Sequence, residues 1–153
     1  HNPALESLDL SDNNIGDENV ATMVDALANI TSLKTLWLGN NRRITALGWR
    51  AVSNLLQQPN SSLKYLSLSG NDINDEVVVA FAHSLVNNTT MRELIFGRYS
   101  SMATRGWDAL SDVLCDKTSI DSIYNSNHTL QEVCYSWDDF VLPSDLTSYL
   151  LLN

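Results

Sequence analysis

The sequence predicts an α/β solenoid, a curved stack of units in which a parallel sheet lines the concave side and helices cover the convex side. The pattern Leu-x-x-Leu-x-Leu-x-x-Asn begins at Leu5, Leu33 and Leu63, so its copies start 28 and 30 residues apart. Degenerate copies begin at Met91 and Leu130. A long, nearly fixed period indicates that each unit buries its apolar side against its neighbours. Each unit also combines strand-like alternation with helix-like spacing, which is the second observation behind the prediction.

In the first unit, Leu8 and Leu10 alternate with polar residues, as in a short, half-buried strand. Asp17 and Glu18 come after the turn, where the positive end of a helix dipole favours carboxylates. The residues that follow have helical spacing: Val20, Met23, Val24 and Leu27. Each unit is therefore predicted to be a strand, a turn, a helix and a loop.

The later units repeat this order. Their predicted helical faces are Val52, Leu55 and Leu56 in the second unit, Val78, Phe81, Ala82 and Leu85 in the third, and Leu110, Val113 and Leu114 in the fourth. A leucine-rich segment at 145–153 predicts a fifth helix. Parallel strands lie ~4.8 Å apart, whereas packed helices need ~8–10 Å, so the stack must bend with its strands inside.

We expect one domain over residues 1–153, with units at 4–31, 32–61, 62–89, 90–128 and 129–153. Residues 115–128 lengthen the fourth unit, and the spacing of Ile120, Ile123 and Tyr124 predicts a helical turn within them. This insertion either covers the convex edge or forms a functional loop. The sequence has no initiator Met and no polar cap at either end, so we expect a longer natural chain or contacts with other subunits.

Asn13, Asn41 and Asn71 end the three regular motifs. An asparagine amide both donates and accepts hydrogen bonds, so stacked copies can satisfy the backbone groups of successive turns. We expect all three side chains to be buried as a structural ladder. The fourth and fifth units have Tyr99 and Asp138 at this position, which interrupts the ladder.

With periods of 28 to 30 residues and a helix in each unit, the chain resembles the ribonuclease-inhibitor-like class of leucine-rich repeat proteins. The resemblance covers nearly the whole chain and implies a right-handed α/β horseshoe segment. It also implies that the concave strands and adjoining loops bind other proteins. The same family includes GTPase-activating members, so a regulatory domain that binds a small GTPase is an alternative.

Helix starts alternate between two types along the chain. Ile15-Gly16-Asp17-Glu18 and Ile73-Asn74-Asp75-Glu76 begin the first and third helices, whereas Gly48-Trp49 and Gly106-Trp107 begin the second and fourth. This alternation resembles the two-repeat pattern of the same family. Because Trp49 and Trp107 occupy equivalent positions, we expect both to pack between helices.

Side chains between the inward leucines of each strand should face the concave surface. An exposed aromatic pair beside a cation is typical of a binding hot spot. The alternative is that the aromatic residues cover each other on an unused sheet face. The candidate protein-binding residues are Trp37, Tyr65, Glu93, Ile95, Arg98 and Trp137.

The composition excludes several classes of partner. A net charge of −9 has the wrong sign for nucleic acid, and no apolar run approaches the ~20 residues of a membrane span. We interpret Cys115 and Cys134 as unpaired thiols, which favours an intracellular, cytoplasmic location over an extracellular one. Glycosylation sequons begin at Asn29, Asn60, Asn87, Asn88 and Asn127, but turn and capping preferences generate such sequences without glycosylation. An extracellular recognition domain is therefore a further alternative.

No pattern indicates an enzyme, a metal site or a cofactor. The histidines are far apart, and neither a phosphate-binding glycine loop nor a nucleophile elbow is present. The sequence therefore predicts a non-catalytic protein-interaction scaffold whose partner it does not identify.

Overall fold

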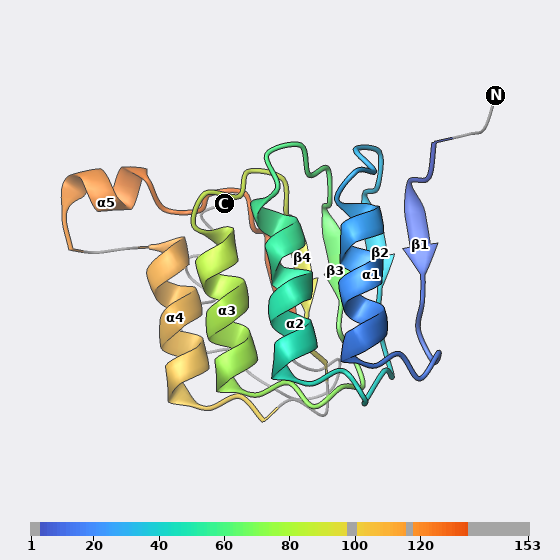
Figure 1. Cartoon of the computed structure of the whole chain (residues 1–153). Helices are drawn as coiled ribbons and strands as arrows, with labels where there is room; N and C mark the ends of the chain where they lie inside the picture. Colours follow the sequence, from blue (N-terminus) through green and yellow to red (C-terminus); the bar gives the residue numbers. More distant parts are fainter. Residues whose placement is uncertain (1–3, 98–100, 116–117, 135–153) are drawn as a thin grey trace.

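The structure is a computed structural model, and it describes residues 4–97, 101–115 and 118–134. Five strands form one parallel sheet in chain order, as predicted (Figure 1). Each strand begins two residues after its motif does, because the first apolar residue precedes the pairing ladder. The strands are β1 (Ser7–Asp9), β2 (Thr35–Trp37), β3 (Tyr65–Ser67), β4 (Glu93–Ile95) and β5 (Glu132–Cys134).

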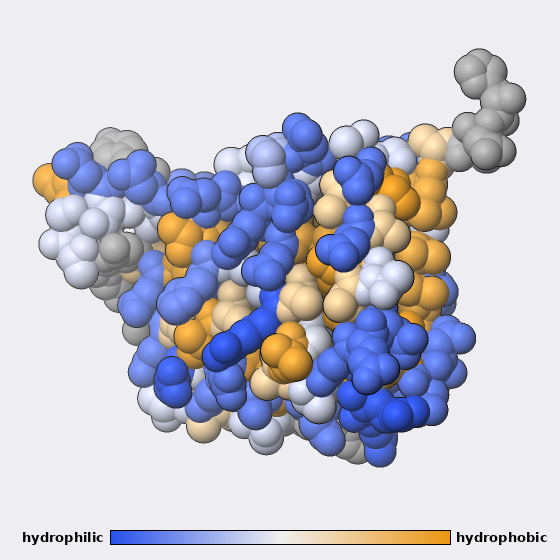
Figure 2. Space-filling view, in the orientation of Figure 1, coloured by the Kyte–Doolittle hydropathy of each residue, from blue (hydrophilic) through white to orange (hydrophobic). Residues whose placement is uncertain are grey.

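The helices α1 to α4 lie side by side over one face of the sheet (Figure 1). They are α1 (Asp17–Leu27), α2 (Ala46–Ser53), α3 (Asp75–Leu85) and α4 (Thr104–Leu114). A 3-10 turn, η1 (Asn54–Gln57), continues α2. Figure 2 shows this helical face, where hydrophilic residues predominate and apolar residues are scattered among them. The fifth helix expected at 145–153 lies outside the described residues.

The core lies between the sheet and the helices. Leu36, Leu66 and Leu94 are fully buried, one from each inner strand. Phe81 of α3 meets Phe96 edge to face, with ring centroids 6.1 Å apart. The tryptophans at the starts of α2 and α4, Trp49 and Trp107, are also buried in this core, in line with the packing role predicted for them.

The alternation of helix starts has a hydrogen-bonding cause. Asp17 begins α1, and its carboxylate accepts bonds from the Thr45 N–H (2.8 Å), the Thr45 hydroxyl (2.7 Å) and the Gly48 N–H (3.2 Å) at the start of α2. Asp75 repeats this arrangement with the N–H groups of Ala103 and Gly106. A Cβ atom at Gly106 would lie 2.8 Å from the Asp75 carboxylate, so the close approach requires glycine. Each odd helix therefore caps the even helix that follows it.

The asparagine ladder forms at two of its three predicted positions. Asn41 and Asn71 are fully buried, and their amide groups donate to carbonyls of the preceding unit, Leu10 and Leu38 (both 2.9 Å). Asn13 is exposed and donates to Ser11 in its own turn, so the prediction of its burial is wrong. The reason is that the described structure contains no unit before the first one, to which Asn13 could reach back.

A second set of buried asparagines lies at the other end of the strands. The repeat motif did not predict their burial. The Asn88 amide donates to the Leu56 carbonyl (2.8 Å) and accepts from the Met91 N–H (2.7 Å). Asn127 makes the equivalent bonds in the next unit, to the Leu85 carbonyl (2.7 Å) and from the Leu130 N–H (3.0 Å). Both residues head glycosylation sequons, so turn chemistry accounts for two of these sequences.

The insertion contains the predicted helical turn, α5 (Ile120–Tyr124). It lies beyond the ends of α3 and α4 in Figure 1. A hollow of about 390 Å³ separates it from these helices, with Ser122 and Asn125 on one side and Ala109 and Val113 on the other. The insertion therefore adjoins the end of the convex layer.

Candidate functional site

The candidate site is the sheet face that points away from the helices. Successive strand residues point to opposite faces, so the residues flanking each buried leucine face the concave side. In the register of the sheet, Asp9 is paired with Trp37, Trp37 with Ser67, and Ser67 with Ile95. The neighbouring row runs from Ser7 through Thr35, Tyr65 and Glu93 to Glu132.

An aromatic pair occupies the open part of this face. Trp37 on β2 and Tyr65 on β3 have ring centroids 5.8 Å apart and ring planes tilted by 54°. Both side chains are partly exposed. The two rings therefore support each other, as expected if they cover each other on an unused sheet face. They also present surface to solvent, as expected of a binding hot spot.

A carboxylate lies beside the aromatic pair. Asp9 on β1 is exposed and is the direct strand neighbour of Trp37. Its Oδ1 atom accepts a hydrogen bond from the Ser11 N–H at 2.9 Å. Hydrogen bonds from the backbone and side chain of Ser11 lower the pKa of the Asp9 carboxyl below its ordinary value, so this group is ionised at neutral pH.

The other predicted site residues differ in accessibility. Ile95 is 2% exposed, so the expectation of an open apolar contact there is wrong. Glu93 is partly exposed. Arg98 and Trp137 lie outside the described residues.

Charged side chains lie at both ends of β1, the strand at the edge of the sheet. Glu6 and Lys34 form an ion pair of 2.9 Å at the starts of β1 and β2, and both are well exposed. Asp12 lies at the other end of β1 in a left-handed turn conformation, with φ of 60°, and it is also exposed. The first unit therefore presents Asp9 and Asp12 to solvent without a paired cation of its own.

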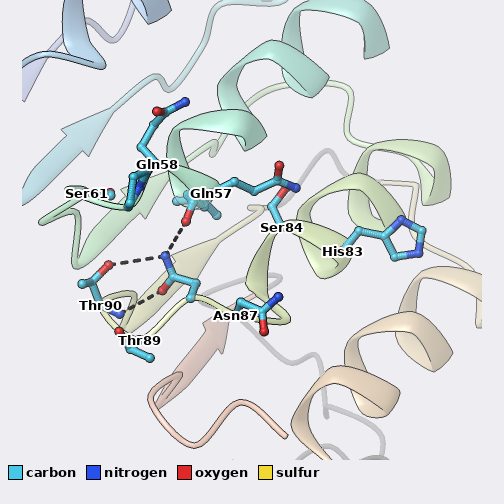
Figure 3. Close-up of a pocket in the computed structure, with 11 residues that line it drawn as sticks. Gln57, Gln58, Ser61, His83, Ser84, Asn87, Thr89 and Thr90 are labelled. Carbon is cyan, nitrogen blue, oxygen red and sulfur yellow. Dashed lines mark hydrogen bonds between the residues drawn. The ribbon is translucent and has the colours of Figure 1, made fainter. Parts of the chain in front are cut away.

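A polar hollow of about 370 Å³ lies elsewhere, at the end of the helical layer (Figure 3). Amide and hydroxyl groups line it, together with the imidazole of His83. Several of these groups bond one another: Gln57 donates to Ser84, and Asn88 bonds Thr90. Asn88 of the second asparagine set is one of the residues that line this hollow, and neither ring of the aromatic pair lines it.

The rest of the described chain offers few groups for other chemistry. Residues 4–97, 101–115 and 118–134 contain no cluster of His, Cys, Asp and Glu that could hold a metal ion. Within the same ranges, no helix has the length and apolar character needed to cross a membrane. Cys115 is a free thiol.

Two family models match the chain. The model "Leucine Rich repeats (2 copies)" matches residues 3–55, and the model "Leucine Rich repeat" matches residues 60–82. Ribonuclease inhibitor from Sus scrofa is 31% identical over 137 residues, and the protein of the same name from Mus musculus is 29% identical over 137 residues. Each match covers 86% of this chain and 30% of the relative, so the chain spans less than a third of these relatives.

Solved structures with the same fold include two of low sequence identity. A structure described as Leiomodin-1 Actin-Binding Site 2 has a TM-score of 0.79 and 19% identity, covering 99% of this chain and 82% of that one. The tropomodulin C-terminal domain of Caenorhabditis elegans has a TM-score of 0.74 and 16% identity, covering 99% and 85%. These two likenesses concern the fold alone.

Proposed function

Since this chain is a leucine-rich repeat protein of the ribonuclease-inhibitor-like class, we propose that it is a non-catalytic scaffold that binds a partner protein through its concave sheet face. The observation that carries the proposal is the partly exposed pair of Trp37 and Tyr65 on adjacent strands. Trp and Tyr are enriched among the residues that dominate the binding energy of protein interfaces.

Several features of the face support a role for this pair as the anchor. Each ring is held by the other, so little side-chain freedom is lost when a partner covers them. Polar and charged residues surround the pair, as in the rim of an interface: Asp9, Thr35 and Glu93. We keep Arg98 and Trp137 as proposed contacts from the sequence pattern, and we assign buried Ile95 to the support of the surface.

The names of similar proteins favour a protein as the ligand. The relatives from Sus scrofa and Mus musculus are named as inhibitors of ribonuclease, and the leiomodin structure is described as an actin-binding site. A ribonuclease and actin are therefore the first defined probes for this chain. No residue in this proposal has a catalytic role.

An intracellular location is part of the same proposal. The free thiol of Cys115 is consistent with a reducing compartment. Among the sequon asparagines, Asn88 and Asn127 are buried and hydrogen-bonded, so glycans there would disrupt the fold.

The test compares proteins retained from an extract of the source cells by three immobilised forms of the chain. These are the wild type, the double variant Trp37→Ala and Tyr65→Ala, and the control Leu47→Ala. Leu47 is 71% exposed at the start of α2, so its replacement tests a loss of apolar surface on the opposite face. Far-ultraviolet circular dichroism and thermal melts establish that all three forms are folded.

We expect the wild type and the control to retain the same partner and the double variant to lose it. With the purified partner, or with ribonuclease or actin, calorimetry should show a loss of at least ~2 kcal/mol for the double variant. Undiminished binding by the folded double variant would contradict the proposal, as would equal losses for the double variant and Leu47→Ala.

A further inference from the structure

We propose that the concave face recognises an arginine side chain of the partner through Trp37, Tyr65 and the carboxylate of Asp9, which lie side by side on three adjacent strands. This inference rests on the proposed function and specifies the chemistry of its ligand.

Trp37 and Tyr65 form an aromatic surface that suits a cation. A cation within about 6 Å of an aromatic ring centroid is attracted by the negative ring face, and Trp is the strongest such partner. Tyr65 meets Trp37 at 54° and at a centroid distance of 5.8 Å, so the two rings form an angled support and not a closed stack. Both remain partly exposed. A flat cation can therefore lie against this surface.

The carboxylate of Asp9 lies on the strand beside this aromatic surface. Asp9 is the register partner of Trp37 across the β1–β2 ladder, and paired residues on parallel strands lie ~4.8 Å apart on the same face. The Ser11 N–H binds Oδ1 of Asp9 and orients the carboxylate. A carboxylate accepts about four hydrogen bonds, so capacity remains for an incoming donor.

The chain's own cations are the first competitors for the carboxylate of Asp9. The described residues provide Asp9 with no ion pair: Lys34 is paired with Glu6, and the Arg42 Nε atom donates to the Gly70 carbonyl. The net charge of −9 also raises the local concentration of cations around the chain. A cationic group from a partner therefore meets a carboxylate that forms no ion pair within the described residues.

Arginine is the cationic side chain that fits both the aromatic pair and the carboxylate. A guanidinium group is planar, so it can stack on an aromatic ring while its edge donates two parallel hydrogen bonds to a carboxylate. A lysine ammonium group is more strongly hydrated and has no flat face. The combination of an aromatic support and a lateral carboxylate therefore fits arginine better than lysine.

The test uses a blocked tripeptide, acetyl-Gly-Arg-Gly-amide, titrated into the nitrogen-15-labelled chain. The matched neutral probe replaces arginine with citrulline, which keeps the shape and removes the charge, and a third probe carries lysine. Chemical shifts of the Trp37 indole N–H and of the backbone amides of β1 and β2 report binding. The matched variants are Asp9→Asn and Asp25→Asn, which change the net charge equally; Asp25 lies exposed on α1.

We expect saturable shifts at Trp37 with the arginine peptide and weaker shifts with the citrulline and lysine peptides. Asp9→Asn should weaken arginine binding by roughly two- to five-fold, because exposed charge pairs contribute little each, and Asp25→Asn should leave it unchanged. Equal responses to arginine and citrulline would overturn the inference. So would stronger binding of lysine, or equal effects of the two substitutions.

Failure of this inference is distinguishable from failure of the proposed function. If the captured partner still requires Trp37 and Tyr65, but Asp9→Asn and Asp25→Asn bind it equally well, the concave interface stands and the arginine site falls. If capture does not depend on the aromatic pair, the interface itself is wrong.

Discussion

The first and second units carry the same motif but occupy different positions in the sheet. In the described structure the second unit has a neighbour on each side, whereas the first has a neighbour on one side alone. Leu36 and Leu38 of the second unit are fully buried, but Leu8 and Leu10 of the first are only partly so. In Figure 2, apolar side chains gather along the edge formed by β1.

The asparagines of the two units differ in the same way. Asn41 bonds backbone groups on both sides of the preceding unit's turn: it donates to the Leu10 carbonyl and accepts from the Ile15 N–H, both in the first unit. Asn13 bonds the Ser11 carbonyl within its own turn. A repeat motif therefore specifies how a unit can interact, and the stabilisation arises at the interface with the preceding unit.

The largest effect that tests this comparison is expected for core leucines. Leu36→Ala removes a fully buried side chain and should cost ~2–5 kcal/mol in the free energy of unfolding, because it leaves a cavity. Leu8→Ala occupies the equivalent position in the first unit and should cost no more than ~2 kcal/mol, since its side chain already meets solvent. Urea unfolding followed by circular dichroism measures both. Equal losses would show that the first unit is packed as tightly as the second.

The next effect concerns the two asparagines. Asn41→Ala leaves the Leu10 carbonyl and the Ile15 N–H without their side-chain partner and should cost ~1–3 kcal/mol. Asn13→Ala should cost only a few tenths of a kcal/mol, because water replaces its single local bond. The same urea series measures the pair. A loss at Asn41 as small as that at Asn13 would remove the ladder as a source of stability.

The sequence predicted the strand order and the helical layer because both follow from one period that recurs along the chain. Leu36, Leu66 and Leu94 lie in register, as the spacing of the motifs requires. The burial of Asn88 and Asn127 does not follow from this period. They lie three residues before the two degenerate motifs, where the second motif has Ile30 and the third has Asn60. Asn60 is exposed, so the residue type at this position does not by itself indicate burial.

Two features of the site depended on tertiary geometry. The burial of Ile95 cannot be read from its strand position, since Trp37 in the equivalent position is partly exposed. The alternation of helix starts was visible in the sequence, but its cause was not. Its cause is a contact between Asp17 and Gly48, which are 31 residues apart in the chain.

The second set of asparagines allows the same comparison between a buried and an exposed side chain. Asn88 is buried, whereas Asn60, which also lies three residues before its motif, is exposed. Asn88→Ala should cost ~1–2 kcal/mol, because the Leu56 carbonyl and the Met91 N–H lose their partner. Asn60→Ala should change stability by less than ~0.5 kcal/mol. Thermal melts and urea unfolding test the pair. A larger loss at Asn60 would show that Asn60 makes a stabilising loop contact that the structure does not show.

The smallest effect concerns Asp17, which joins the first unit to the second. The hydrogen bond from the Thr45 hydroxyl is the main cause that lowers the pKa of this carboxyl below 3.8, and the N–H groups of Thr45 and Gly48 add to it, against the opposing effect of burial. A carboxyl whose pKa is lowered on folding stabilises the protein above its unfolded pKa, and this contribution disappears as the pH falls through the folded pKa. Asp17→Asn should therefore cost roughly 0.5–1 kcal/mol near neutral pH, a value reduced by partial exposure.

The cost of Asp17→Asn should shrink as the pH falls below 3.8, the ordinary pKa of the carboxyl, because the unfolded wild-type chain then binds a proton that the folded carboxylate does not yet bind. Urea unfolding of the two proteins from neutral pH down to ~pH 3 measures the difference in stability, and groups common to both cancel in that difference. Asp25→Asn is the control, since the Asp25 side chain lies exposed on α1 and caps no following helix. A constant gap between wild type and Asp17→Asn over this range would mean that the charge of Asp17 does not stabilise the junction between the first two units. The neutral hydrogen bonds to Thr45 and Gly48 would then hold that junction, together with the packing of the two units and the exposed ion pair of Glu6 and Lys34.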